Sequence, residues 1–352
     1  MGDLDALADA ARASGAPGVV VVRRDRGETT FGSAGIADID SGDPLGTARQ
    51  FFVGSVGKTF TAALVLALVA DGQLDLDEPV GPHLGEVSVG PAVRVRHLLQ
   101  HTSGLPDIFA EPSFFAALRQ DPWRRWQIAD LLALVLSVQA EPPGARWSYS
   151  NTNYLLLSLV IEQVGGTPVP DQLRERIAVP LGLQSTELGP APPDGIARAY
   201  MPPDNPFLPA AEGLVDATAL TTSLAYPAAL VSTPADVARF LEALLDGTLL
   251  PPELKEELLE TVPADGVECD AYGLGIARSS SFFGTSPSPC GAAWGHLGLT
   301  PGHTTIALSR EDGTRQVVVA ANAGFIEAQA WEPLAGAAWS AFCGDERGGK
   351  EQ

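Results

Sequence analysis

The most apolar stretch of this chain is FFVGSVGKTFTAALVLALVA, residues 51–70, and it holds a lysine at position 58. The chain has only three lysines among its 22 basic residues, and the other two, Lys255 and Lys350, lie in polar surroundings. Ser55 lies three positions before Lys58, so on a helix the two side chains share a face, roughly 5–6 Å apart at Cβ. A buried lysine, unlike an arginine, can lose its proton and then accept one from a hydroxyl. The stretch therefore predicts a core helix that opens with an activated serine nucleophile.

Two other interpretations of this stretch stay open. Ser55 could cap the helix while Lys58 extends its ammonium group to the rim of the core. Gly57-Lys58-Thr59 also matches the end of a phosphate-binding loop, but the first glycine of that motif would fall on Phe52. The chain has no second glycine-rich turn of the kind that binds nucleotides, so we disfavour the phosphate loop.

Composition excludes several classes of partner. The chain has 352 residues, 45% of them hydrophobic, and a formal net charge of −21, which argues against nucleic acid and anionic membranes. No basic and apolar leader follows Met1, and the apolar run after Lys58 is too short to span a bilayer, so we expect a cytoplasmic protein. The three cysteines match no zinc-site spacing and are expected as reduced thiols, with a Cys269–Cys290 bridge as the alternative to that state and Cys343 unpaired. We expect no metal and no cofactor.

Apolar periodicity predicts an α+β fold in which both chain ends contribute strands to one mixed antiparallel sheet, flanked by helices, with an all-helical lobe inserted between them. The expected strands are 18–23, 29–36, 272–277, 293–296, 304–308 and 316–321. The expected helices are 3–14, 55–71, 95–100, 128–138, 154–164, two within 234–261, and 331–342. Residues 1–80 and 230–352 would form the α/β lobe and residues 81–229 the helical lobe. Within the latter, the segment from 186 onward is rich in proline and small residues and is expected to form a lid.

Three further segments carry groups suited to the same chemistry. Tyr149 and Asn151 lie two residues apart on an expected loop, and a phenol near an ammonium group can shuttle protons. Alternatively, Tyr149 packs on the lobe and Asn151 caps a helix. In residues 294–303, glycines around an edge strand permit close approach of a ligand, although an ordinary strand end with a surface histidine has the same pattern. His101, in the third segment, is expected to hydrogen-bond a turn rather than to act as a base.

The chemistry-bearing residues occur as three motifs in a fixed order: Ser55-x-x-Lys58, Tyr149-x-Asn151 and His296-x-Gly298. Together they resemble the serine β-lactamase and penicillin-binding-protein superfamily. The detailed likeness is to its class C branch, which includes D-alanyl-D-alanine carboxypeptidases and related esterases, and it covers most of residues 15–340. The resemblance implies a β-lactamase-like fold with the active site between the sheet and the helical lobe.

The resemblance also implies a role for each matching residue. Ser55 would be the nucleophile, Lys58 would help to deprotonate it, and Tyr149 would be the general acid and base. The backbone N–H groups of Ser55 and Leu299 would form an oxyanion hole. The substrate-binding residues would be Asn151, His296, Gly298 and Leu299, with Asn151 orienting the acyl side and His296 near the polar end of the substrate.

Several positions depart from the usual pattern of the superfamily. Leu297 replaces a small hydroxyl residue, His303 stands where an aromatic residue is usual, and Gly57 occupies a position that is usually bulkier. Residues 226–229 replace a glycine-rich turn. These changes argue against a standard peptidoglycan or β-lactam substrate.

The predicted function is a serine acyl-enzyme hydrolase that acts on a small-molecule or peptide-like ester or amide. The alternative is an acyltransferase that passes the acyl group from Ser55 to an amine or alcohol. A dry acceptor site, made by Leu297, Leu299 and the aromatic residues of 107–126, would favour transfer, but we favour the interpretation that those aromatics pack the lobe. A third possibility is a non-catalytic sensor that only becomes acylated. The oligomeric state is left open.

Overall fold

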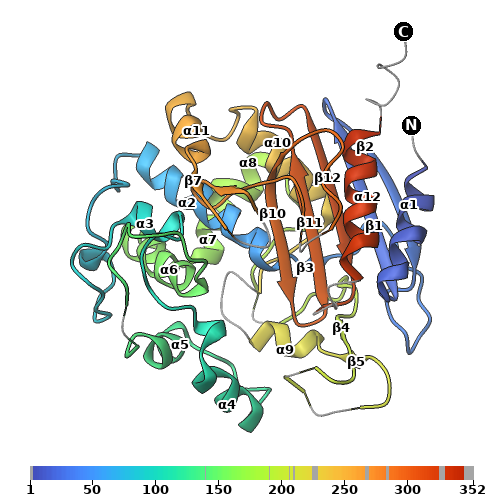
Figure 1. The fold of residues 1–352 in the computed structure, drawn as a ribbon, viewed down its shortest axis with the longest axis horizontal. Helices are drawn as coiled ribbons and strands as arrows, with labels where there is room; N and C mark the ends of the chain where they lie inside the picture. Colours follow the sequence, from blue (N-terminus) through green and yellow to red (C-terminus); the bar gives the residue numbers. More distant parts are fainter. Residues whose placement is uncertain are drawn as a thin grey trace.

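The computed structural model describes residues 3–138, 140–189, 191–205, 207–208, 211–223, 229–265, 269–282, 285–324 and 330–344. Its main feature is an eight-stranded antiparallel sheet with the strand order β2-β1-β12-β11-β10-β9-β8-β7 (Figure 1). The strands of this sheet are β1 (Gly18–Asp25), β2 (Glu28–Gly35), β7 (Val262–Pro263), β8 (Ala271–Tyr272), β9 (Ala277–Ser279), β10 (Ala293–Thr300), β11 (His303–Ser309) and β12 (Arg315–Ala321). Two-stranded pairs are formed by β3 (Phe51–Phe52) with β6 (Val231–Ser232), and by β4 (Tyr200–Met201) with β5 (Val215–Asp216).

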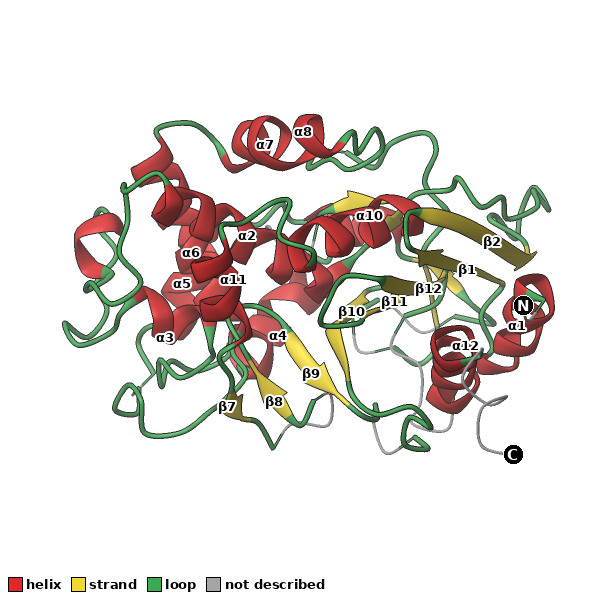
Figure 2. Ribbon diagram, turned by 90° about the horizontal axis from the view of Figure 1, so that it is seen from above, coloured by secondary structure: helices red, strands yellow, loops and turns green. Residues whose placement is uncertain are grey.

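The two ends of the chain meet where β1 pairs with β12, and Val21 lies opposite Val319. The prediction of one sheet built from both chain ends is therefore confirmed. The valine run of β1 has no polar face because helices cover both sides of the sheet. Val19 and Val21 pack in one hydrophobic cluster with helices α1 (Leu4–Ala11) and α12 (Trp331–Cys343). Val20 and Val22 point the opposite way, into a second cluster that includes α10 (Pro234–Leu245). Figure 2 shows α10 on one side of β1 and β12, and α1 and α12 on the other.

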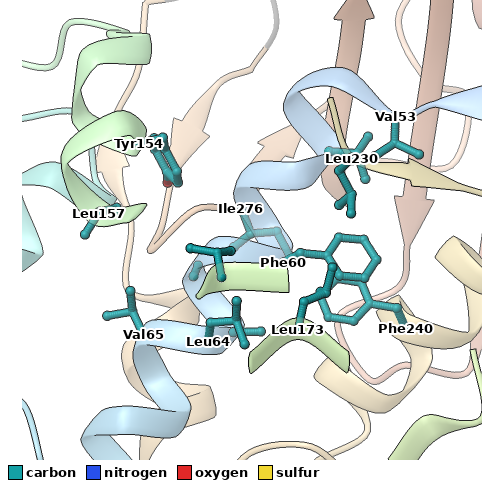
Figure 3. Packing of buried hydrophobic residues seen from close by; sticks show 14 of the residues in the cluster. Val53, Phe60, Leu64, Val65, Tyr154, Leu157, Leu173, Leu230, Phe240 and Ile276 are labelled. Atoms are coloured by element: carbon teal, nitrogen blue, oxygen red, sulfur yellow. The ribbon is translucent and has the colours of Figure 1, made fainter. Parts of the chain in front are cut away.

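Helix α2 (Gly57–Ala70) is the predicted core helix, and it is buried on nearly all sides. A helix that is apolar all round needs partners on every side. Phe60 stacks on Phe240 of α10 with ring centroids 3.7 Å apart, and α6 (Asn151–Gly165) brings Tyr154 and Leu157 to another side of α2 (Figure 3). The helix thus connects the sheet with the helical lobe.

The remaining helices lie mostly in the predicted helical lobe. They are α3 (Val95–Leu99), α4 (Pro112–Gln120), α5 (Ile128–Val135), α7 (Val169–Leu173), α8 (Val179–Leu181), α9 (Thr218–Ser223) and α11 (Pro252–Leu259). We keep the division into an α/β lobe (1–80 and 230–352) and a helical lobe (81–229) as a proposal. Residues 224–228 of the predicted lid, and with them most of the altered turn at 226–229, lie outside the described residues.

Two sequence expectations about local structure are wrong. The predicted strand 272–277 is a tight hairpin in which β8 and β9 flank residues 273–276. The N–H of Gly273 donates to the carbonyl of Ile276, and Gly275 has a positive φ of 74°, so the chain reverses there. The core helix begins at Gly57 rather than at Ser55, because Gly54–Val56 form a separate 3-10 turn.

The cysteine prediction also needs correction. Cys290 and Cys343 are joined by a disulfide, whereas reduced thiols were expected. Cys269, the partner considered from the sequence, is a free and buried thiol. The sequence could not reveal this pairing, because it arises where the end of α12 packs beside the segment that leads into β10.

His303, at the start of β11, is fully buried and joins two distant segments. Its Nδ1 accepts the N–H of Phe52 at 2.9 Å, and its Nε2 lies 3.1 Å from the carbonyl oxygen of Ala197. A carbonyl can only accept, so Nε2 carries the proton and the ring is neutral. Burial lowers the pKa of His303 to about 3. These contacts assign His303 a structural role.

Acid should destabilise the protein through His303. Its pKa is lower in the folded than in the unfolded state, so the stabilisation is complete above pH 6.5 and declines as pH falls from 6.5 toward 3. Between pH 7 and pH 5 this residue should account for a loss of about 2 kcal/mol in the free energy of unfolding. Urea denaturation of wild type and His303→Asn at both pH values checks this, because the variant should lose less stability than wild type. Equal losses in the two proteins would contradict the assignment.

Candidate active site

Ser55 lies in the 3-10 turn between β3 and α2, beneath strand β10. Gly54 has a φ of +55°, and a Cβ atom there would lie 2.7 Å from the backbone nitrogen of Leu299. A Cβ on Gly298 would lie 1.9 Å from the carbonyl oxygen of Val53. These two glycines permit β10 to pack directly on the turn, which brings Leu299 next to the serine. Ser55 itself is partly exposed between buried neighbours.

Lys58 lies one turn further along, in the first turn of α2, and is 1% exposed. Its Nζ is 2.9 Å from Oγ of Ser55 and donates to Oδ1 of Asn151 at 2.7 Å. No side chain caps α2, and Lys58 does not reach a solvated rim, so the capping interpretation of the Ser-x-x-Lys motif is wrong. The hydroxyl and the amine are in direct contact, as the helical spacing predicts.

Asn151, the first residue of α6, is oriented by a carboxylate that sequence analysis did not identify. Its Nδ2 donates to both carboxylate oxygens of Asp107, at 3.1 and 3.2 Å, and its backbone N–H donates to the same group at 2.9 Å. A carboxylate accepts but does not donate, so the amide has one orientation, with Oδ1 turned to Lys58. Asp107, Asn151, Lys58 and Ser55 therefore form one hydrogen-bonded chain.

Loss of the Asp107 carboxylate should impair the site through Asn151. In Asp107→Ala the Asn151 amide loses the acceptor that fixes its orientation, so Lys58 is held less well, and we expect kcat to fall about 10- to 100-fold with a smaller change in KM. Steady-state kinetics on a chromogenic ester, with the thermal midpoint as a check on folding, measure this. Asp121→Asn, an exposed aspartate after α4, is the matched control. A wild-type kcat in folded Asp107→Ala would show that the Asn151 amide keeps its orientation without the Asp107 carboxylate.

Tyr149 forms part of an aromatic enclosure around the ammonium group of Lys58. Nζ lies 4.9 Å from the ring centroid of Tyr149 and 5.4 Å from that of Tyr154, both within the range of cation–π attraction. The ring of His101 packs on Tyr149 at 4.2 Å. Nδ1 of His101 accepts the N–H of Ser150 at 3.1 Å, and burial, followed by the charge of Lys58, holds its pKa well below the usual value. His101 thus hydrogen-bonds the 149–151 loop, as expected from the sequence.

His296 lies on β10, with its ring centroid 6.3 Å from that of Tyr149. Its Nδ1 lies 2.6 Å from the carbonyl oxygen of Leu297, so Nδ1 carries the proton. Nε2 then accepts the hydroxyl of Tyr272, at 2.9 Å. Burial and, second, the charge of Lys58 lower the pKa of His296 to about 3, so the ring is neutral.

All seven residues predicted for the site thus lie around Ser55 or along the β10 strand that packs on it. The residues that sequence analysis missed are Asp107 and Tyr272. Asp107 follows the Gly104-Leu105-Pro106 turn, where an aspartate signals little more than a loop. Tyr272 was expected only as a strand residue, and no spacing connects it with His296.

Leu297 does not support the apolar acceptor surface that was considered as an alternative to packing of the lobe. This side chain is 3% exposed and packs in the cluster formed by α12 and the sheet. Phe114 and Trp126 are also buried and contact each other with ring centroids 5.6 Å apart, so these aromatics pack the lobe. Within the described ranges, no three His, Cys, Asp or Glu side chains gather so that they could hold a metal ion, and no helix is both long and apolar enough to cross a membrane.

An antiparallel sheet with helices on both faces, and a serine–lysine pair between it and a helical lobe, is the β-lactamase-like fold. The chain belongs to the β-lactamase family, whose model matches residues 4–333. The resemblance inferred from the three motifs is therefore confirmed.

Individual relatives fall in several branches of hydrolases and penicillin-binding proteins. The chain is 31% identical to Esterase EstB of Burkholderia gladioli, covering 79% of each chain. It is 27% identical to a penicillin-binding protein of Bacillus subtilis (strain 168), covering 82% of this chain but only 64% of the length of that protein. Among solved structures, a D-amino acid amidase from Ochrobactrum anthropi SV3, in complex with L-phenylalanine amide, matches with a TM-score of 0.81 and 29% identity over 97% of this chain and 98% of that one.

Proposed function

We propose that this protein is a serine hydrolase that cleaves an ester or amide through a covalent acyl-enzyme on Ser55, at a site between the two lobes. The observation that carries the proposal is the 2.9 Å contact between Nζ of Lys58 and Oγ of Ser55, made by a lysine that is 1% exposed. Relatives named as an esterase and an amidase support ester and amide bonds as the targets.

In the first half of the reaction, Lys58 acts as a neutral amine. The Ser55 hydroxyl gives its proton to Nζ while Oγ bonds to the substrate carbonyl carbon, which produces a tetrahedral anion. The bond to the leaving group then breaks, and that group takes a proton from the phenol of Tyr149. Lys58 returns a proton to Tyr149, which leaves the amine neutral again. The acyl group remains on Ser55 as an ester.

In the second half, water replaces the leaving group. Water gives a proton to the Lys58–Tyr149 pair as its oxygen bonds to the acyl carbon. The bond from that carbon to Oγ then breaks, Oγ takes the proton, and the acid product leaves. The buried positions of Leu297, Phe114 and Trp126 support hydrolysis over transfer to an amine or alcohol, because none of these side chains is available to line an apolar acceptor site.

The developing oxyanion needs donors that point into the site, and the register of β10 supports Leu299 as one of them. Thr300 and His303 close the two-residue turn between β10 and β11, so they form a hydrogen-bonded pair. The next pair, Leu299 and Thr304, is then a non-hydrogen-bonded pair of the antiparallel ladder. In such a pair the backbone N–H does not face the partner strand, so the N–H of Leu299 points away from β11. The N–H of Ser55, next to the Gly54 contact, would be the second donor.

Labelling with a fluorophosphonate, followed by peptide mapping, tests the proposal directly. We expect a single adduct on Ser55, turnover of a chromogenic ester by unlabelled protein, and loss of turnover in proportion to labelling. Added amines should not speed turnover, and if they do, the enzyme is an acyltransferase. An adduct without any turnover would indicate a protein that is only acylated. Absence of an adduct on Ser55 would overturn the proposal.

A further inference from the structure

We propose that His296 and Tyr272 make this site selective for substrates whose leaving group carries no carboxylate, such as primary amides and uncharged esters. The inference rests on the proposed function and names its substrate class. It also assigns to Tyr272 a positioning role that acts through His296.

Both nitrogens of His296 are already engaged. Nδ1–H donates to the carbonyl of Leu297, and Nε2 accepts the hydroxyl of Tyr272. A histidine that recognises a carboxylate offers an N–H, and preferably a positive charge. In the neutral His296 ring the single N–H, on Nδ1, donates to the backbone carbonyl of Leu297. Nε2 carries no proton, so it can accept a hydrogen bond but cannot donate one. His296 therefore presents neither a free donor nor a cation to a substrate anion.

Tyr272 is positioned to keep His296 in this protonation state. Its side chain is 1% exposed, and its ring lies edge-on to both His296 and Tyr149, with interplanar angles of 87° and 89°. Burial raises the pKa of Tyr272 well above the usual value, so the phenol keeps its proton and remains a donor to Nε2. A second proton on His296 would force the phenol to turn its O–H away and accept from Nε2 instead, and it would place a charge among buried side chains.

The charge around the site also disfavours a substrate anion. Lys58, in the state that carries its proton, is a cation near the His296 ring, but it is committed to Ser55 and Asn151. Leu297, which follows His296, turns an apolar side chain into the core beneath the sheet. The net charge of −21 adds a long-range field that opposes the approach of anions. Together these features disfavour a carboxylate beside the scissile bond and leave neutral leaving groups unaffected.

Two achiral esters with leaving groups of similar size test the selectivity. We would compare 3-carbamoylphenyl acetate, whose leaving group is neutral, with 3-carboxyphenyl acetate, whose leaving group is anionic. Wild type should prefer the neutral ester by at least about 10-fold in kcat/KM, a difference of about 1.4 kcal/mol. If deacylation is slow, the rate at which acyl-Ser55 forms is compared instead of kcat/KM. Mass spectrometry of the intact protein measures that rate. Equal rates, or a preference for the anionic ester, would overturn the proposal.

Two variants separate a recognition role from a structural one. His296→Lys introduces an ammonium group at the same position and should reduce the preference to below about 3-fold. In Tyr272→Phe, Nε2 loses its hydroxyl donor and the space left by the hydroxyl can admit water, which relieves part of the burial of the His296 ring. His296 should then gain a proton more readily, so the preference should weaken as pH falls from 7.5 to 5.5, while in wild type it stays constant. Tyr200→Phe, which removes another buried tyrosine hydroxyl that bonds Ile39, is the matched control and should behave as wild type. A preference that is independent of pH in folded Tyr272→Phe would remove Tyr272 from the proposal.

The same experiment distinguishes failure of this inference from failure of the proposed function. A protein that forms the fluorophosphonate adduct on Ser55 and cleaves both esters equally is a serine hydrolase without the proposed selectivity. A protein that forms no adduct and cleaves neither ester is not a serine hydrolase, and the selectivity fails with it.

Discussion

Ser55→Ala should abolish turnover of esters and amides, with a loss of at least about 10⁴-fold in kcat. Oγ is the atom that would form the acyl bond, and the chain of contacts from Asp107 through Asn151 and Lys58 ends on it. The substitution removes one small, partly exposed group, so the fold should persist. The measurement is kcat on a chromogenic ester, with the thermal midpoint determined in parallel.

The matched control is Ser113→Ala, because Ser113 is an exposed serine on α4. That variant should retain wild-type turnover and fluorophosphonate labelling, whereas Ser55→Ala should lose both. If folded Ser55→Ala kept normal activity, the nucleophile would be elsewhere, and the Ser55–Lys58 contact would be structural only.

Lys58→Arg should also lose activity, by about 10²- to 10⁴-fold, although the positive charge is retained. Arginine does not lose its proton in proteins, so it cannot accept the proton of Ser55. The guanidinium is also larger than the ammonium group, in a position that is 1% exposed and enclosed by the rings of Tyr149 and Tyr154. The rate of acylation by a fluorophosphonate measures the loss at the step in which Lys58 acts.

Because Lys58 is buried, its substitution by arginine could reduce activity simply by disturbing the fold. A second variant distinguishes that effect from loss of the proton acceptor. Lys58→Met has a side chain of similar length without the charge, and it should be equally impaired while keeping a thermal midpoint at or above that of Lys58→Arg. Lys255→Arg, on the partly exposed helix α11, should have no effect. A rate near wild type in Lys58→Arg would mean that Lys58 provides charge alone, and the base would have to be Tyr149.

The sheet was largely predictable because the residue pattern within each long strand is sufficient to identify it. The valines of β1 and β12 form continuous apolar runs, which are typical of strands covered on both faces, and both strands were expected. The hairpin at 271–279 was missed because its reversal depends on Gly273 and Gly275 against neighbouring segments. The carbonyl of Gly275, for example, accepts the hydroxyl of Thr59 on α2. Such a turn is selected by a tertiary contact, which periodicity does not reveal.

The disulfide and the short elements of the lid also could not be predicted from local sequence patterns. Cys290 and Cys343 are separated by 53 residues, and only the packing of α12 beside the sheet brings them together. The segment predicted as one long irregular lid contains short elements, among them β4, β5 and α9, each too short to give a periodic pattern.

The sequence by itself determined that Ser55 and Lys58 lie side by side, because a spacing of three residues at the start of a helix is a matter of local geometry. It also determined which strands are buried, through side-chain alternation and apolar runs. Only the tertiary structure decided how the pair is held and what the site can recognise. Asp107 orients Asn151 across 44 residues, and Tyr272 engages His296 across 24. These hydrogen bonds depend on which loops and strands pack together, and that is set by burial of the core as a whole rather than by any local spacing.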